Sequence, residues 1–293
     1  MAAPAEPTRP KTVSDLTRWL ERDVSPRVPE GTEAIAHGGT ALTLLGIKDS
    51  TKDVDFAFRT RDGFDAVVKA LTTMGYRRTM EMSPVPGEEF LRLENAAVVV
   101  DVVDVRFPTW NGWRLTGAVF RNAIVIPLGN VRLVRPDRDA VFLFKTYPLR
   151  ETDLADLRAI LAKDPPDEAR VIALFDEQDA IHRAELLEET RHEPLINILE
   201  LRVRFAASIG LLEPSERGRI PGIARHARNR FRELRLRPGL STLIRRLRSE
   251  TVAKWEDILA ASGDRLRQQL AVKKGPKRTA PSQTRRRDAR GPR

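Results

Sequence analysis

Asp53 and Asp55 are the residues whose type and spacing most directly suggest chemistry in this chain. A single valine separates them, and alternate side chains of a β-strand lie on one face, so both carboxylates would project together. Two carboxylates this close repel each other unless a cation lies between them. Proteins hold Mg²⁺ with one or two carboxylates plus the phosphate oxygens of a substrate. The pair therefore predicts a metal site that faces a nucleotide.

A glycine pair, Gly38-Gly39, lies upstream of the acids and opens an apolar, helix-compatible run. Because glycine has no Cβ, its backbone can come close to a ligand, and the N–H groups at the start of a helix form an anion site. We expect Gly38, Gly39 and the hydroxyl of Thr40 to bind phosphate groups.

The stretch from His37 to Asp55 resembles the first motif of the polymerase-β-like nucleotidyltransferase superfamily, and most of all its prokaryotic AbiEii-toxin-like branch. The shared pattern is Gly-Gly-Thr-Ala-Leu, then Gly-x-Lys, then Ser/Thr-Lys-Asp-x-Asp. The resemblance implies transfer of a nucleoside monophosphate from a nucleoside triphosphate (NTP) to a hydroxyl acceptor, with release of pyrophosphate. It adds Ser50, Thr51 and Lys52 to the expected nucleotide-binding residues.

The resemblance also calls for a third carboxylate on a neighbouring strand. The apolar run 98–105 is interrupted by Asp101 and Asp104, and a carboxylate in such a strand is costly unless it is paired or metal-bound. Three residues apart, the two face opposite sides, so only one can join the first two acids. We favour Asp104, because residues 110–116 resemble the segment that follows this acid in the family; Asp101 is the alternative. The three acids would hold two Mg²⁺ ions, and the third acid would help to activate the attacking hydroxyl.

Two later segments resemble further motifs of the same superfamily. A helix over 139–145 ends in Phe-Lys, and an Arg-x-x-Asp-Leu-x-Asp-Leu pattern starts at Arg150. By this resemblance, Lys145 at the rim of the site would contact the nucleotide phosphates. Arg150 and Asp153 would order the site or the incoming base. Asp156 lies one helical turn after Asp153.

Residues 13–164 are expected to form an α/β (α+β) nucleotidyltransferase core, in which helices pack on a short mixed sheet. The acids need a strand over 52–58, and the third acid needs a hairpin strand over 96–105 that pairs with 90–93. The other elements expected are strands over 34–36 and 131–134 and helices near 14–20, 40–45 and 64–74.

Pro165-Pro166 marks a boundary, after which residues 165–272 are predicted to form an all-α, basic domain. Helices are expected over 168–189, 195–209, 221–236, 242–247 and 251–270. Residues 1–12 and the basic tail 273–293 are predicted to be disordered, because both are rich in Pro or charge and poor in apolar side chains.

The charge distribution suggests a polyanionic partner. The net charge is +10, and residues 217–248 alone carry 11 arginines against one glutamate. Arginine suits phosphate oxygens because its planar fork donates two hydrogen bonds at once. We expect these residues and the tail to bind the backbone of RNA, which makes RNA the leading acceptor. Ordinary solvated helix faces are the alternative explanation.

Several function classes are excluded or left open. The chain has no cysteine, which rules out thiol nucleophiles and cysteine-ligated zinc, and it has no apolar run long enough for a membrane span. We expect a cytoplasmic protein with no membrane partner. The resemblance further implies a toxin-like role with an antitoxin partner. The alternatives are nucleotide transfer to a protein or a small molecule, and a nucleic-acid-binding protein that uses the fold without catalysis.

Overall fold

The computed structural model describes residues 12–82, 89–96, 98–104, 113–148, 150–188 and 193–235. All of them belong to one compact unit, Met1–Ser241. Predictions for residues 1–11 and 236–293, the basic tail included, lie outside the described residues.

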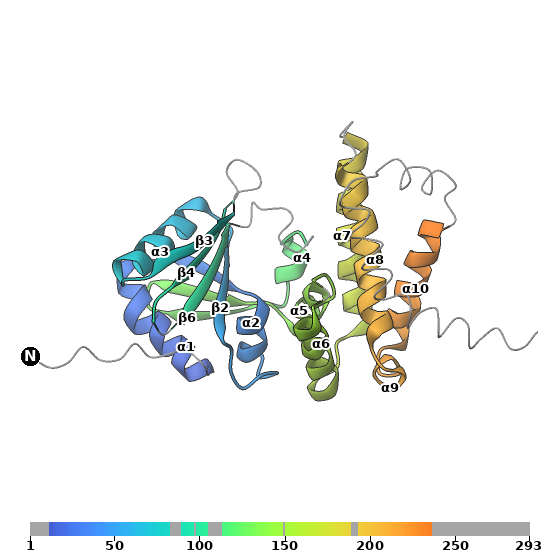
Figure 1. Ribbon diagram of the computed structural model, residues 1–293, viewed down its shortest axis with the longest axis horizontal. Helices are drawn as coiled ribbons and strands as arrows, with labels where there is room; N and C mark the ends of the chain where they lie inside the picture. The colour runs from blue at the N-terminus through green and yellow to red at the C-terminus, as the bar shows by residue number, and fades with distance from the viewer. Residues whose placement is uncertain are drawn as a thin grey trace, which may run out of the picture. The chain divides into compact units, whose positions relative to one another are not determined.

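Seven strands form one mixed sheet in the order β3-β4-β5-β2-β1-β7-β6 (Figure 1). They are β1 (Thr32–Ala36), β2 (Asp53–Phe58), β3 (Arg77–Met82), β4 (Phe90–Glu94), β5 (Val99–Asp104), β6 (Ile124–Leu128) and β7 (Val131–Arg135). The pairs β1–β7 and β2–β5 are parallel, and the other neighbours are antiparallel. The strand that carries the paired acids, β2, therefore lies at the centre of the sheet, between β5 and β1.

One face of the sheet is covered by the main hydrophobic core. Val54, Phe56 and Phe58 alternate along β2 and are buried in this core, as are Val100 and Val102 on β5. Helix α1 (Val13–Trp19), the π-helical η1 (Leu20–Val24) and α3 (Arg61–Thr73) contribute to it, and the cluster continues into the later helices. The 3₁₀-helical η2 (Ser25–Arg27) follows η1 and contacts α3. Because side chains alternate along a strand, the acids of β2 lie on the opposite face.

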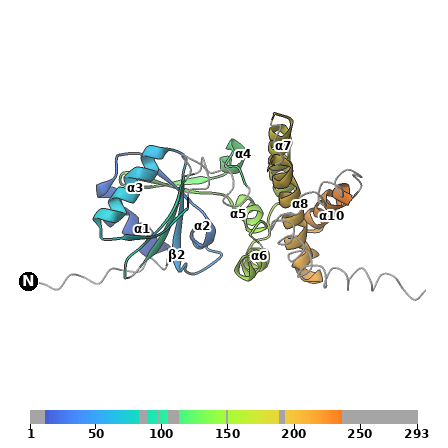
Figure 2. The ribbon, with the colours of Figure 1, turned by 45° about the horizontal axis from the view of Figure 1, so that its top comes forward.

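That opposite face is partly covered by shorter segments. Ile35, Ala57 and Val134 form a small cluster there, against Leu115 and Phe120. The helices nearby are α2 (Gly38–Leu44), α4 (Gly117–Phe120), α5 (Arg138–Lys145) and α6 (Glu151–Lys163). Helix α2 packs on β2 and α5, and α5 packs in turn on α6 and α7 (Figure 2). The chain therefore brings its glycine pair and Lys145 to the same side of the sheet as the acids.

The helical region comprises α7 (Glu168–Glu188), α8 (Glu193–Leu211), α9 (Pro214–Arg217) and α10 (Pro221–Arg235). Helices α7, α8 and α10 pack together, with the rings of Phe175 and Phe205 stacked 4.3 Å apart. Contacts cross the boundary predicted at residues 164–165: Arg170 donates to Asp137 at 3.0 Å, and the backbone N–H of Asp167 donates to Asp139 at 3.0 Å.

A mixed α/β sheet domain followed by helices was predicted and is confirmed. The edge strands β3 and β6 were missed. β3 is Arg-Arg-Thr-Met-Glu-Met, without apolar alternation, and β6 contains Pro127 and is largely exposed, so neither shows the pattern of a buried strand. Among the described helices, none combines the length and apolar character that crossing a membrane requires.

Candidate functional site

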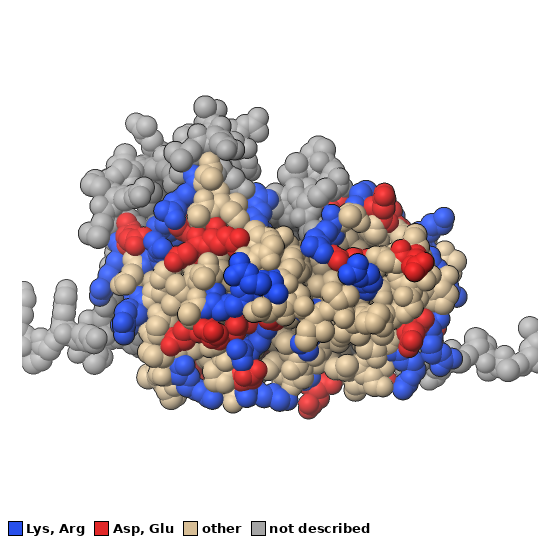
Figure 3. Space-filling view, turned by 180° about the vertical axis from the view of Figure 1, so that it is seen from behind, with Lys and Arg blue, Asp and Glu red and all other residues tan. Residues whose placement is uncertain are grey.

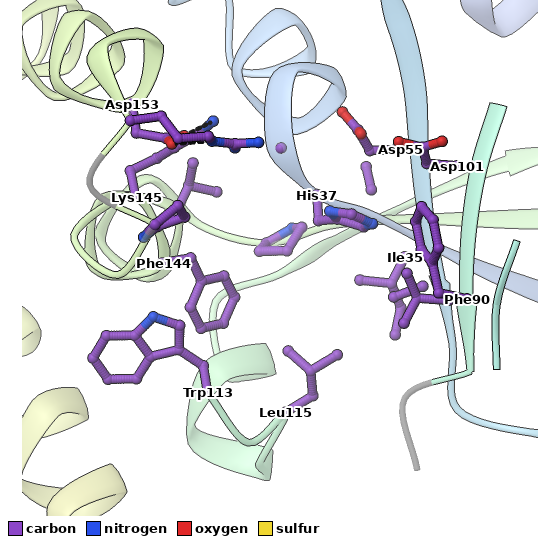
Figure 4. Close-up of a pocket in the computed structure, with 18 of the residues that line it drawn as sticks. Ile35, His37, Asp55, Phe90, Asp101, Trp113, Leu115, Phe144, Lys145 and Asp153 are labelled. Atoms are coloured by element: carbon purple, nitrogen blue, oxygen red, sulfur yellow. Dashed lines mark hydrogen bonds and ion pairs between the residues drawn. The ribbon is translucent and has the colours of Figure 1, made fainter. Parts of the chain in front are cut away.

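A cavity of about 250 Å³ opens on the face of the sheet that carries the acids. Its apolar wall is formed by side chains from four strands, the 113–115 segment and α5: Ile35, Ala57, Phe90, Val103, Trp113, Leu115 and Phe144. Its polar lining comprises His37, Asp55, Arg92, Asp101, Lys145, Arg150 and Asp153. Figure 4 shows Asp55 and Asp101 side by side at one end, and Lys145 with Asp153 across from them. The cavity therefore joins charged groups of both signs to an apolar compartment.

Asp55 is the best-positioned of the predicted acids. Its carboxylate lines the cavity, and its Oδ2 accepts a hydrogen bond from the backbone N–H of Gly39 at 3.0 Å. Burial raises the pKa of Asp55, and the neighbouring charge of Asp101 raises it further, whereas His37 and Lys145 act in the opposite direction. A carboxylate that is crowded in this way gains most from a bound cation. Asp53 lies on the same face of β2, partly exposed, but outside the cavity lining.

Gly39 and Thr40 hold Asp55 in place. The hydroxyl of Thr40, fully buried, accepts a hydrogen bond from the backbone N–H of Asp55 at 2.8 Å. Because this hydroxyl and the N–H of Gly39 are already engaged, the structure gives them a positioning role in place of the phosphate contact that we expected.

Both glycines are needed for the close approach of α2 to β2. Gly38 has a φ of +55°, and a Cβ there would lie 2.5 Å from Oδ2 of Asp55. A Cβ on Gly39 would lie 2.6 Å from the hydroxyl of Thr51. The sequence signal of paired glycines is thus explained by contact with the protein's own acid and threonine.

The remaining residues of the first motif lie at its edge. The hydroxyl of Thr51 donates to the backbone carbonyl of Asp53 at 2.7 Å and so closes the turn before β2. Ser50 and Lys52 are exposed. Their side chains are free to meet a ligand that approaches from solvent.

The third carboxylate on this face is Asp101, and our preference for Asp104 is wrong. In the parallel register of β2 and β5, Asp101 lies opposite Asp55, whereas Asp104 lies opposite Phe58. Asp104 is fully buried on the core side of the sheet, so it cannot join the other acids. The expectation that the two acids face opposite sides is confirmed.

Arg92 on β4 binds Asp101, a contact that no local sequence pattern indicates. Its Nε donates to Oδ1 of Asp101 at 2.8 Å, and its Nη2 donates to Oδ2 at 2.7 Å. The pKa of Arg92 is raised by the hydrogen bonds to Asp101 and, to a smaller extent, by the charges of Asp53 and Asp55. Three neighbouring strands thus present Asp55, Asp101 and Arg92 in one row.

The residues fit one divalent ion better than two. Within the described part of the chain, no group of three histidine, aspartate or glutamate side chains is arranged to hold a metal. Asp53 and Asp55 share a strand face and could bind one Mg²⁺ that phosphate oxygens complete. We expected Asp104 or Asp101 to share a second ion. Asp104 is buried on the core side, and both oxygens of Asp101 accept hydrogen bonds from Arg92. Neither carboxylate is therefore available to a second ion.

Lys145 is buried in the cavity wall rather than at a rim. Its Nζ lies 3.0 Å from Asp153 and 2.7 Å from Asp156, and Asp156 also forms an ion pair with Lys48. Burial alone would lower the pKa of Lys145, but these carboxylates outweigh it and raise the pKa. Lys145 therefore remains charged, and it links α5 to α6.

Arg150 completes this cluster from a more exposed position. Its Nε donates to Oδ2 of Asp153 at 2.6 Å. Burial opposes ionisation of Asp153, yet the hydrogen bond from Arg150 and the charge of Lys145 hold the pKa of Asp153 below its ordinary value. Three cations, Lys48, Lys145 and Arg150, therefore share the two carboxylates of Asp153 and Asp156, which leaves one net positive charge available to a phosphate.

His37 lies directly beside the acids in the cavity lining. Burial lowers the pKa of His37, although the charge of Asp55 partly offsets this, so the imidazole is neutral at pH 7. Its Nε2 is buried without a hydrogen-bond partner in the described structure. Its position next to the glycine pair was the only signal that could have identified it.

Comparison with known proteins adds no family to this description. No family model matches the chain, and no curated protein or solved structure is detectably similar to it. A function can therefore be inferred only from the sequence motifs and from the geometry of the cavity.

Proposed function

We propose that the chain is a Mg²⁺-dependent nucleotidyltransferase, which moves a nucleoside monophosphate from an NTP to a hydroxyl acceptor. The observation that carries the proposal is the position of Asp55. It lies in register with a second acid in the lining of a cavity, and a glycine pair packs directly against its carboxylate. The same cavity contains Arg92, Lys145 and Arg150, which suit the negative charge of a triphosphate.

Asp53 and Asp55 would hold the ion together with phosphate oxygens, and the bound ion would offset the charge that develops on the reacting phosphate. The residues of the chain have the positioning roles. Thr40 and Gly39 orient Asp55, and the cluster around Lys145 places positive charge across the cavity. Such preorganised charge needs little rearrangement during the reaction.

RNA is the acceptor that we propose first. Arg225, Arg228 and Arg232 are exposed on α10 at spacings of three and four residues, which brings them to one side of the helix. Arg228 donates its Nε–H to the carbonyl of Ala224 one turn earlier and keeps its other donors exposed. Two further arginines of the predicted basic stretch also have internal partners: Arg217 donates to the carbonyl of Gly210, and Arg230 binds Asp176. Among residues 217–233, whose side chains the structure describes, the surface available to a phosphate backbone is therefore narrower than the sequence suggested.

The proposal is tested by nucleotide binding that depends on both metal and acid. Each NTP would be titrated into the full-length chain by calorimetry, with and without Mg²⁺. We expect Mg²⁺-dependent binding in the wild type and its loss in Asp55→Asn, which preserves shape but removes the charge. Glu81→Gln, an exposed change on β3, is the control that should retain binding. Equal affinity in wild type and Asp55→Asn would contradict the proposed site.

A second candidate is a non-catalytic nucleic-acid-binding protein on this scaffold. It is favoured by the state of two expected catalytic groups, since Asp101 is held by Arg92 and Lys145 by two carboxylates. The two candidates differ in their requirement for NTP. A binder would retain its affinity for RNA in Asp55→Asn and would show no Mg²⁺-dependent uptake of nucleotide.

A further inference from the structure

Arg92 occupies the position in which a second cation would be expected. A two-ion site needs a third carboxylate that is free to share a metal with the first pair. Here both oxygens of that carboxylate, on Asp101, already accept N–H groups of one guanidinium, at 2.8 and 2.7 Å. A divalent ion on the same oxygens would lie beside a fixed positive charge that repels it.

The contact is built into the sheet. Arg92 and Asp101 are direct cross-strand partners in the antiparallel register of β4 and β5, and Asp101 is the direct partner of Asp55 in the parallel register of β5 and β2. Directly opposite side chains lie close enough to interact. The order of strands therefore places Asp55, Asp101 and Arg92 next to one another, in that order, in the lining of the cavity.

Arg92 also has donors to spare. Its Nε and Nη2 are used by Asp101, whereas its Nη1 group has no hydrogen-bond partner among the described residues. The side chain lines the cavity and is 36% exposed, so this group is accessible from the cavity side. A guanidinium with one edge on a carboxylate and another edge free is suited to a phosphate oxygen.

We propose that this site takes one divalent ion, at Asp53 and Asp55, and that Arg92 supplies the second positive charge in place of a second ion. This inference rests on the proposed function and specifies how that function would be achieved. The ligand of the free edge of Arg92 is a phosphate oxygen of the NTP. Asp101 is then a positioning residue, because it holds the guanidinium rather than a metal.

The test counts bound ions. Mn²⁺ would be titrated into the full-length chain in the presence of each α,β-methylene NTP in turn, and bound Mn²⁺ would be measured by loss of the free-ion electron paramagnetic resonance signal. We expect one Mn²⁺ per chain in the wild type. Arg92→Gln frees Asp101 and should bind a second Mn²⁺, and Arg92→Gln combined with Asp101→Asn should return the count to one. Arg132→Gln, an exposed change on β7 of the same sheet, should leave it at one.

Two ions in the wild type would overturn the inference, whether or not the variants fold. One ion in a folded Arg92→Gln, shown by an unchanged Tm, would also overturn it, because removal of the guanidinium would then have exposed no metal site. The proposed function fails separately: if Asp55→Asn binds the same single ion as the wild type, the ion is not held by the predicted acids. Zero ions in every protein would overturn both proposals.

Discussion

At the scale of single residues, Gly38 is the position where one added methyl group should damage the site most. Its backbone is left-handed, with a φ of +55°, and an added Cβ would lie 2.5 Å from Oδ2 of Asp55. In Gly38→Ala, left-handed strain of about 1–2 kcal/mol adds to a displacement of the carboxylate. We expect affinity for Mg²⁺–NTP to fall by about tenfold or more, which corresponds to about 1.4 kcal/mol.

Gly46→Ala is the matched control for this prediction. Gly46 is also left-handed, with a φ of +68°, but nothing lies within 4 Å of its added Cβ. Chemical denaturation should show a comparable strain cost in both variants, whereas calorimetry should show lost nucleotide affinity in Gly38→Ala alone. Equal binding by the two variants would show that contact with Asp55 is unimportant.

Asp153 should make stability depend on pH in the acid range. The ordinary pKa of an aspartate is about 3.9, and the pKa of Asp153 is lower in the folded chain despite its burial, because of Arg150 and Lys145. The unfolded chain therefore takes up this proton first as pH falls. The contribution of Asp153 to stability is fully present above about pH 4 and is lost as pH falls through the folded-state pKa.

Asp153→Asn should thus lower the free energy of unfolding by about 3 kcal/mol at neutral pH, because it removes one partner of a buried ion pair. The difference from wild type should shrink as pH falls below about 4. Urea denaturation at a series of pH values measures both quantities. A difference that stays constant down to the lowest pH would mean that the carboxylate is not ionised in the folded chain.

At the scale of secondary structure elements, the two faces of β5 separate the roles of its acids. Asp101 faces the cavity and binds Arg92, whereas Asp104 is fully buried on the core side. Asp101→Asn should lower the rate of nucleotide transfer by about 100-fold, the order of loss expected when a charged group near the reaction is misplaced. Asp104→Asn should lower Tm and leave the rate per folded molecule unchanged. The reverse pattern in rates would restore Asp104 as the third acid.

Local sequence signals predicted the central elements of this fold. Strand β2, helix α3 and the hairpin β4–β5 have the alternation or the helical spacing that identifies them, and the acid pair of β2 shares a face as its spacing requires. The edge strands β3 and β6 lack this signal because one face of an edge strand can be polar and its N–H groups need no partner.

Register and long-range pairing are what local patterns could not supply. A two-residue turn at Glu94-Asn95 would have paired Arg92 with residue 97, but the hairpin closes between Asn95 and Val98, so Arg92 meets Asp101. The choice between Asp101 and Asp104 depended on the same register. The ion pair of Lys48 with Asp156 joins residues more than a hundred positions apart, and only the packing of α2 against the later helices brings them together.

At the scale of the whole molecule, the described residues form no continuous basic surface on the face shown in Figure 3. On the face shown in Figure 3, lysine and arginine side chains are interleaved with aspartate and glutamate. The exposed arginines of α10, Arg225, Arg228 and Arg232, are the described residues best suited to RNA. Their combined replacement by glutamine should weaken RNA binding and reduce the slope of log affinity against log salt by about 2, at about 0.7 per phosphate contact on a single strand.

A matched triple variant separates a local interface from general charge. Arg22, Arg77 and Arg78 are also exposed, but they lie on η1 and β3. Replacing all three by glutamine removes the same charge and should leave the salt slope unchanged. Filter-binding measurements at several salt concentrations would detect the difference. If log affinity falls with log salt at the same slope in both triple variants, α10 attracts RNA only through nonspecific charge.

In the proposed function, Asp53 and Asp55 form part of an enzyme that transfers nucleotides. Its most direct test is incubation of the full-length chain with each α-labelled NTP, Mg²⁺ and total RNA, beside the double variant Asp53→Asn/Asp55→Asn. We expect label to enter RNA, with one NTP preferred, only when both acids are intact. Absence of label from RNA, protein and small molecules alike, or equal labelling by the double variant, would contradict it.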